Sequence, residues 1–158
     1  MFTFKDIIAL AVQIENNGEE IYRRAMQRNA SPELSDLLSW IADEEARHGE
    51  WFEALGRRAA PAAVDGAMEK MGRIMLRSTV EEQSFSLDEF DLSRTADAER
   101  VLTQSIEFEE DTVAFYQMIH PFLQDPEAVD ALDRIIEEER RHIEQLQKMR
   151  AALKTENA

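Results

Sequence analysis

The chain has 158 residues, enough for one domain with a sizeable core. With five glycines, four prolines and 32% charged residues, its composition is typical of a helical protein. The absence of cysteine excludes disulfides, thiolate metal sites and iron–sulfur modules. The net charge of −15 argues against a DNA or RNA partner, because nucleic-acid binding requires a basic surface.

The N-terminal segment MFTFKDIIALAVQIE contains an apolar run that is short and is interrupted by Glu15. No small-residue cleavage site follows it, so we expect neither a signal peptide nor a membrane span. A soluble cytoplasmic protein is the resulting expectation.

Four long helices are predicted in chain order, over residues of about 3–29, 32–58, 97–120 and 126–153. Thr3 and Asp97 are candidate N-caps for the first and third helices. Ser31-Pro32 and Asp125-Pro126 place a capping side chain before a proline at the first helical position of the other two. Between the second and third helices, Met68, Met71 and Met75 recur at helical spacing and indicate a short extra packing helix.

The sequence repeats itself at an offset of 94 residues. Residues 31–50 and 125–144 share ten identities in twenty positions without a gap, where average composition would give roughly one or two. The segment Glu44-Glu45-Ala46-Arg47-His48 falls on Glu138-Glu139-Arg140-Arg141-His142. Each repeat therefore reads as one helical hairpin, over residues of about 3–58 and 96–154, with a long crossover of about 59–95 between them. The predicted fold is a single all-α domain over residues 1–158, a four-helix bundle made of two repeated hairpins.

Four acids and two histidines lie in the apolar stripes of these helices, where solvent-facing residues are not expected. Glu45 and His48 fall among residues such as Leu38, Ile41 and Phe52, and the second repeat places Glu139 and His142 equivalently. The first and third helices add Glu15 and Glu109. Positions equidistant from each predicted turn lie at one level of a hairpin, so all six side chains should meet in one layer of the core.

Buried carboxylates are costly unless cations or protons neutralise them. Two divalent cations would balance four carboxylates, and two neutral imidazoles would complete the coordination. Glutamate and histidine without thiolate suit iron, manganese or zinc. The sequence thus predicts a dinuclear metal site, with Glu15, Glu45, His48, Glu109, Glu139 and His142 as candidate ligands.

This paired Glu-x-x-His pattern, with one further glutamate on each of two helices, resembles the ligand set of the ferritin-like di-iron carboxylate proteins. Within that class, the phrase IADEEARHGEWFEAL and the internal repeat look most like the rubrerythrin branch. The resemblance implies two iron ions per chain bridged by Glu45 and Glu139. His48 and His142 would then bind one ion each, and Glu15 and Glu109 would be terminal ligands.

The chain departs from the rubrerythrin pattern in two respects. Rubrerythrins commonly carry another carboxylate three residues after the third-helix ligand, where this chain has Thr112. A shifted register with Glu107 and Glu110 as ligands would restore a pair three apart, but it would break the repeat, so Glu109 is preferred. The chain also has no rubredoxin module, and electrons would have to come from an external donor protein.

Residues beside the candidate ligands have weaker signals. Tyr22 and Tyr116, the only tyrosines, each follow a glutamate ligand by seven residues and could hydrogen-bond site carboxylates or simply pack in the core. Glu44 and Glu138 precede the histidines by four residues and are expected in outer or surface roles. Trp40 falls off the ligand face, which favours packing or a subunit contact.

Three functions fit these patterns. The first, which the resemblance favours, is a redox enzyme that reduces hydrogen peroxide or dioxygen. The second is ferroxidase or iron-handling activity, and the third is a metal-binding bundle without catalysis. A homodimer or larger homo-oligomer is expected, with no nucleic-acid or membrane partner.

Overall fold

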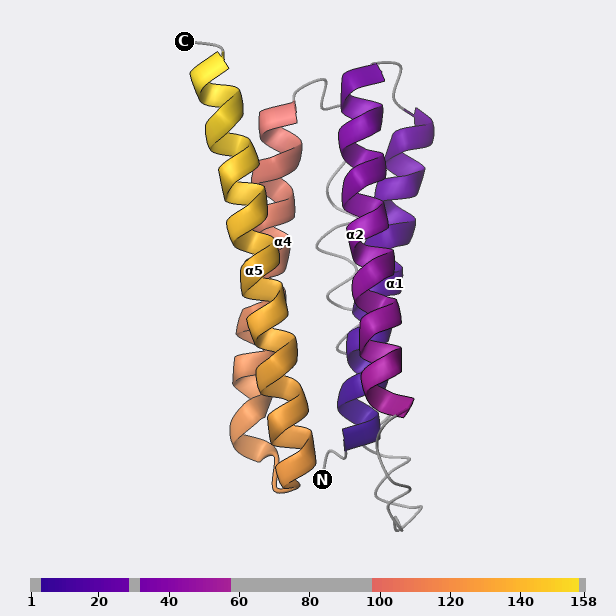
Figure 1. The fold of residues 1–158 in the computed structure, drawn as a ribbon, viewed down its shortest axis with the longest axis vertical. Helices are drawn as coiled ribbons and strands as arrows, with labels where there is room; N and C mark the ends of the chain where they lie inside the picture. The colour runs from indigo at the N-terminus through magenta and orange to yellow at the C-terminus, as the bar shows by residue number, and fades with distance from the viewer. Residues whose placement is uncertain (1–3, 29–31, 58–97, 157–158) are drawn as a thin grey trace.

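The computed structural model describes residues 4–28, 32–57 and 98–156, and they form four long helices (Figure 1). These helices are α1 (Phe4–Arg28), α2 (Pro32–Arg57), α4 (Ala98–Ile119) and α5 (Pro126–Glu156), and a 3₁₀ turn, η2 (His120–Phe122), follows α4. In Figure 1, α1 and α5 run upward while α2 and α4 run downward. The described part of the chain is all-α, which confirms the predicted four-helix bundle.

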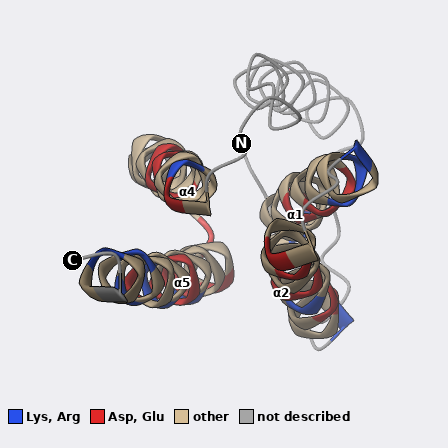
Figure 2. Ribbon diagram, turned by 90° about the horizontal axis from the view of Figure 1, so that it is seen from above, with Lys and Arg blue, Asp and Glu red and all other residues tan. Residues whose placement is uncertain are grey.

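The two hairpins predicted from the repeat are α1 with α2 and α4 with α5, and the most extensive helix contacts are made within each hairpin. Viewed along the bundle, the hairpins stand side by side (Figure 2). The end of α2 and the start of α4 lie at opposite ends of the bundle, as a crossover connection requires. The predicted crossover itself, with Met68, Met71 and Met75, lies outside the described residues.

The helix boundaries agree with the sequence-based ranges to within a few residues. Asp125 accepts a hydrogen bond through Oδ1 from the backbone N–H of Glu127 at 3.1 Å, so it caps α5 as predicted. At its other end α5 continues to Glu156, three residues beyond the predicted end at Leu153. The candidate caps Thr3, Ser31 and Asp97 lie outside the described residues.

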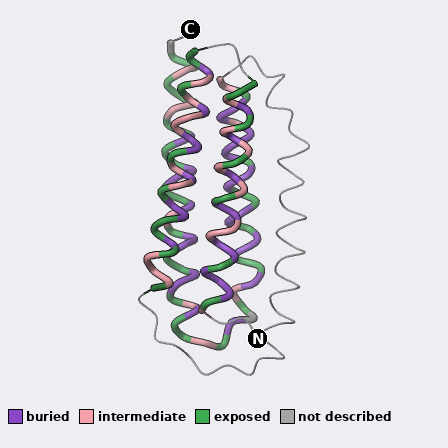
Figure 3. Tube along the Cα trace, turned by 90° about the vertical axis from the view of Figure 1, so that its right-hand side faces the viewer, coloured by how far each residue is buried: buried purple, intermediate pink, exposed green. Residues whose placement is uncertain are grey.

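The core consists of the apolar stripes of all four helices, and buried residues recur along the length of the bundle (Figure 3). Within the described helices, ten polar or charged residues are buried with them, and six of these are the predicted ligands. These six lie near the middle of their helices, so they occupy one layer halfway up the bundle. None of the four long described helices has an apolar stretch long enough to cross a membrane.

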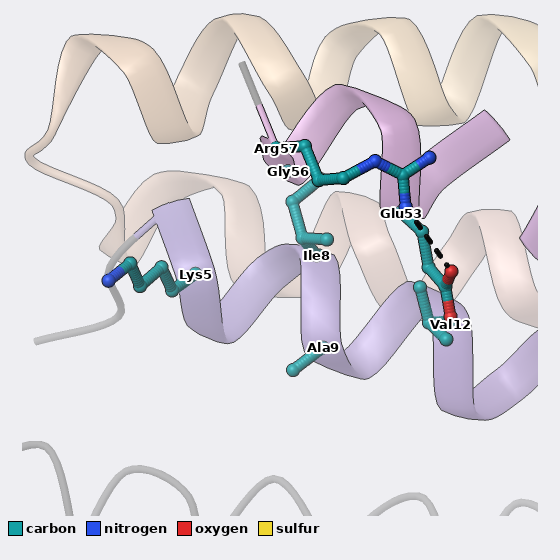
Figure 4. Close-up of a pocket in the computed structure, with 7 residues that line it drawn as sticks. All are labelled: Lys5, Ile8, Ala9, Val12, Glu53, Gly56 and Arg57. Carbon is teal, nitrogen blue, oxygen red and sulfur yellow. Dashed lines mark ion pairs between the residues drawn. The ribbon is translucent and has the colours of Figure 1, made fainter. Parts of the chain in front are cut away.

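One open surface groove lies outside this layer, between the start of α1 and the end of α2 (Figure 4). Its volume is 490 Å³, and an ion pair between Arg57 and Glu53 at 3.6 Å lies at its edge. The groove is lined by Lys5, Ile8, Ala9, Val12, Glu53, Gly56 and Arg57. None of the candidate ligands lines it.

Candidate metal centre

The six candidate ligands form a layer, which we call the acidic layer. Each helix contributes to it because a glutamate interrupts the apolar stripe of that helix at this level. Glu15 on α1 and Glu109 on α4 are each 1% exposed, while Glu45 on α2 and Glu139 on α5 are 1% and 0% exposed. His48 and His142 follow the α2 and α5 glutamates by three residues, which keeps them on the same helical face. Their rings meet edge to face with centroids 4.8 Å apart.

The distances within the layer follow the two-fold symmetry of the repeat. His48 Nδ1 lies 3.6 Å from Glu15 Oε2 and 3.8 Å from Glu139 Oε2. His142 Nδ1 lies 3.0 Å from Glu109 Oε1 and 3.8 Å from Glu45 Oε1. Each imidazole therefore lies beside one glutamate of its own hairpin and one glutamate of the other hairpin. The two hairpins contact each other through these side chains.

The four carboxyl groups of the layer cannot all be ionised at once near neutral pH. Burial, and then the charge of the neighbouring carboxylates, raises the pKa of Glu15, Glu45 and Glu139 well above the ordinary value. Burial would also raise the pKa of Glu109, but His142, a hydrogen bond with Glu45 and the nearby His48 together outweigh burial and lower that pKa. In the absence of metal cations, protons bound to these carboxyl groups must therefore neutralise the layer.

The state of His48 suits metal ligation. Burial, and then the proximity of His142, lowers the pKa of His48 to about 4. His48 is therefore neutral near pH 7, which is the form that can offer a nitrogen lone pair to a metal.

The unsatisfied polar atoms of the layer test whether a metal would fit. Buried polar groups in proteins nearly always have hydrogen-bond partners, and exceptions require an explanation. Among the described residues, however, both carboxylate oxygens of Glu45 and of Glu139, Nδ1 of both histidines, and one oxygen each of Glu15 and Glu109 make no well-directed hydrogen bond, although His142 Nδ1 and Glu109 Oε1 lie 3.0 Å apart. Two ligand groups, His48 with Glu139 and His142, and Glu45 with Glu109 and His142, have their donor atoms within 4.8 Å of one another. This oxygen and nitrogen donor set fits divalent iron, manganese or zinc.

The alternative ligand register is not supported by burial. Glu107 and Glu110 are exposed on α4, whereas Glu109 between them faces the layer. Thr112 is buried one turn further along α4, and its hydroxyl finds no partner in the described part of the chain.

The remaining candidates lie at the edge of the centre. Glu138 Oε1 is 3.7 Å from His48 Nε2, on the side of the ring that faces away from the carboxylates. Glu44 instead pairs with Arg47 at 2.6 Å. Trp40, expected off the ligand face, packs its ring edge-on to His142 with centroids 6.3 Å apart. Tyr22 and Tyr116 are both buried beside the layer.

Two neighbours of the centre could not be anticipated from motif spacing alone. Ser105 on α4 accepts a hydrogen bond from the Tyr22 hydroxyl at 3.0 Å, a contact between the two hairpins. Gly18 on α1 leaves space for Glu45, because a Cβ atom at Gly18 would lie 2.7 Å from Glu45 Oε2. Both positions differ between the two repeats, since Ser105 aligns with Ala11 and Gly18 with Thr112. The sequence shows these differences, but only the packing of the helices shows that the two residues contact Tyr22 and Glu45.

Comparison with known families agrees with this geometry. A family model described as Rubrerythrin matches residues 6–150, nearly the whole chain. The chain belongs to the rubrerythrin family. Membership in the rubrerythrin family makes it a carboxylate protein of the di-iron class, in agreement with the buried glutamate and histidine cluster. Comparisons with curated protein sequences and with solved structures return no match.

Proposed function

We propose that this rubrerythrin-family protein is a peroxidase that reduces hydrogen peroxide at a dinuclear iron centre, with electrons from an external donor protein. The observation that carries the proposal is the set of buried carboxylate and imidazole atoms without partners, contributed symmetrically by both hairpins. Glu15, Glu45, His48, Glu109, Glu139 and His142 would hold the two ions, with Glu45 and Glu139 between them. Two ferrous ions, when bound, would supply the two electrons that convert hydrogen peroxide and two protons into two water molecules.

The protein's own side chains would prepare the site for this reaction. The apolar residues around the layer exclude bulk water, which strengthens each electrostatic interaction within it. His48 is held neutral by burial, so it is available as a ligand. His142 Nδ1 lies 3.0 Å from Glu109 Oε1, so a proton shared by this pair would have to leave before these atoms could bind a metal.

The composition supports the proposal of an external electron donor. The chain has no cysteine and hence no iron–sulfur or rubredoxin group that could return electrons to the site. We propose a separate redox protein as the electron source. A homodimer or larger homo-oligomer is part of the same proposal.

Thr112 favours a second candidate, a ferroxidase or oxidase that uses dioxygen. This position lacks the carboxylate that many rubrerythrins carry there, and its buried hydroxyl does not replace that charge. If the missing carboxylate is what favours peroxide, the oxidant preference of this chain would reverse.

Stopped-flow mixing of the iron-loaded, reduced protein with each oxidant distinguishes the candidates. We expect oxidation by hydrogen peroxide to be faster than oxidation by dioxygen at matched concentrations, with a second turnover only after a reductant is added. Faster oxidation by dioxygen would reject the peroxidase and support the second candidate. Absence of oxidation by both would leave only a non-catalytic metal site.

A further inference from the structure

The two candidate ligand histidines have different surroundings at Nε2, the nitrogen that faces away from the carboxylates. A ligand histidine is usually fixed by a hydrogen bond from the ring nitrogen that does not bind the metal. His48 Nε2 lies 3.7 Å from Glu138 Oε1 on the other hairpin and 3.5 Å from Arg47 Nη2. His142 Nε2, in contrast, is buried and has no hydrogen-bond partner among the described residues. The repeat relates the two rings, so a symmetric bundle would surround both nitrogens alike.

Glu44 does not give His142 the contact that Glu138 gives His48. The 94-residue offset relates Glu44 to Glu138. The carboxylate of Glu44 is directed to Arg47 on its own helix, with the guanidinium 2.6 Å from Oε2 and 3.3 Å from Oε1. The outward nitrogen of His142 is therefore left without the usual carboxylate.

His142 instead has an aromatic neighbour from the opposite hairpin. The rings of Trp40 and His142 meet edge-on, with centroids 6.3 Å apart and planes at 61°. Trp40 is half-buried and packs against the hydrophobic core. The repeat places Arg134 at the position equivalent to Trp40, so this contact has no aromatic counterpart beside His48. The ring next to His48 is Phe52, from its own helix, at 6.2 Å.

The packing of Trp40 supplies a restraint that the polar contacts of His142 do not. His142 Nδ1 lies 3.0 Å from Glu109 Oε1, and a ring held at one atom can still pivot about that atom. Contact with a second ring restricts the plane of the imidazole, and edge-on aromatic pairs are favourable beyond the apolar area that they bury. The other ring beside His142 is that of His48, itself a candidate ligand.

We propose that Trp40 is a positioning residue for His142. The indole ring of α2 fixes the imidazole of α5 in the orientation that presents Nδ1 to the centre, in place of the hydrogen bond that a ligand histidine usually makes. The half-site of His142 then depends on the other hairpin for its rigidity. The consequence for metal binding rests on the proposed metal centre, whereas the packing of Trp40 on His142 does not.

The fixed orientation is tested first without metal. The chain has three histidines, so ¹³C-labelled histidine gives three sets of ring signals, and NMR relaxation measures the motion of each ring. We expect Trp40→Leu to increase the motion of the His142 ring and Trp40→Phe to restore most of its rigidity. Trp51→Leu is the matched control, since Trp51 lies on the same helix and packs on Phe52. No increase in Trp40→Leu, or an equal increase in Trp51→Leu, would overturn the proposal.

The effect on the centre is tested by anaerobic titration with Co²⁺ alone. We expect Trp40→Leu to weaken Co²⁺ binding by about tenfold or more, as is usual when the residue that orients a ligand is removed. Trp40→Phe should lose less, and Trp51→Leu should bind Co²⁺ as the parent does. The N–H proton of each Co²⁺-bound imidazole has a separate shifted NMR signal, and Trp40→Leu should change that of His142 and leave that of His48. Circular dichroism and melting curves establish that each variant is folded.

The outcomes separate this inference from the proposed function. Unchanged Co²⁺ affinity in Trp40→Leu, or an equal loss in Trp51→Leu, would overturn the positioning role of Trp40. Failure of the parent protein to bind Co²⁺ would instead reject the proposed metal centre, and the relaxation comparison would still decide whether Trp40 fixes the imidazole of His142.

Discussion

Glu109 differs from the other three carboxyl groups of the buried layer. All four are buried, but the pKa of Glu109 alone among them is lowered, because His142 at 3.0 Å, a hydrogen bond with Glu45 and the nearby His48 together outweigh the effect of burial. The metal-free centre thus combines one favoured carboxylate with three carboxyl groups that tend to hold protons. Metal ions must displace those protons, so metal affinity should increase with pH.

The bridging assignment predicts unequal losses of metal. Glu45 and Glu139 would each contact both ions, whereas Glu15 would contact one. We therefore expect Glu45→Ala or Glu139→Ala to remove most of the roughly two ions per chain that a di-iron site holds, while Glu15→Ala retains more. Metal content after dialysis, measured by mass spectrometry, checks this. Equal metal content in the Glu45→Ala and parent proteins would refute the assignment.

Gly18 provides a second prediction about Glu45. A Cβ atom there would meet Glu45 Oε2, the end of a flexible side chain, so the carboxylate can move aside while the helices stay in place. We expect Gly18→Ala to fold normally but to bind Co²⁺ about tenfold more weakly, a loss typical of a disturbed ligand orientation. Titration with Co²⁺ and a melting curve separate the two effects. Unchanged affinity would show that Glu45 does not need this space.

The burial of individual residues was predictable where it depends on helical periodicity. The six ligand candidates interrupt apolar stripes, so their location in the core followed from spacing, and the internal repeat favoured Glu109 over Glu107 and Glu110, which are exposed. Contacts between hairpins were not predictable in this way. The Tyr22–Ser105 bond and the edge of Trp40 on His142 depend on how two helices are rotated and shifted against each other. The relative rotation and shift of two helices cannot be predicted from the periodicity of the sequence.

At the scale of whole helices, the two hairpins are packed differently. The contact between α1 and α2 is more extensive than that between α4 and α5. Gly18, Gly49 and Gly56 lie along the α1–α2 contact, and the repeat replaces them with Thr112, Ile143 and Arg150. None of the described glycines has a positive φ, so their role in α1 and α2 is to leave space. The first hairpin can close more tightly as a result.

This packing predicts opposite effects of two alanine substitutions in α2. A Cβ atom at Gly56 would lie 2.8 Å from Ile8 Cγ2, and overpacking costs about 1–3 kcal/mol. A Cβ atom at Gly49 would meet Glu15 Cβ at an ordinary 3.5 Å. Helix propensity favours alanine over glycine by up to about 1 kcal/mol.

We therefore expect Gly56→Ala to lower the free energy of unfolding by about 1 kcal/mol, the overpacking cost less the gain in propensity. Gly49→Ala should raise it by roughly 0.5–1 kcal/mol. Urea unfolding of the metal-free proteins measures both. A stabilised Gly56→Ala protein would mean that Ile8 moves freely and that the close approach of α1 and α2 is not limiting.

For the molecule as a whole, the acidic layer couples stability to pH. The raised pKa values of Glu15, Glu45 and Glu139 mean that the folded state binds more protons than the unfolded state above the ordinary carboxyl pKa. Their stabilising contribution is complete at low pH and is lost as pH rises through the folded values. His48 has the opposite effect, because folding lowers its pKa from 6.5 to about 4. It reduces the stability of the folded state only when the pH is below its unfolded pKa.

We therefore expect the metal-free protein to become more stable as pH is lowered from about 8 to about 6.5, by roughly 1 kcal/mol per pH unit for each excess proton bound. Below that range the gain should flatten, because His48 and Glu109 then favour the unfolded state. Thermal melts across the pH range provide the measurement, with the metal-loaded protein as the control. Metal-free stability that is constant or decreases over the first interval would contradict a cluster of buried, proton-sharing acids.

The internal repeat also suggests a history for the molecule. Each hairpin carries half of the ligand set, and the two halves meet around a two-fold axis through reciprocal contacts of His48 and His142. Two separate copies of one ancestral hairpin could have assembled the same centre as a homodimer. After fusion of the two genes, each hairpin could have acquired its own substitutions. Gly18 and Thr112, or Ala11 and Ser105, are differences that a dimer of identical hairpins could never have acquired.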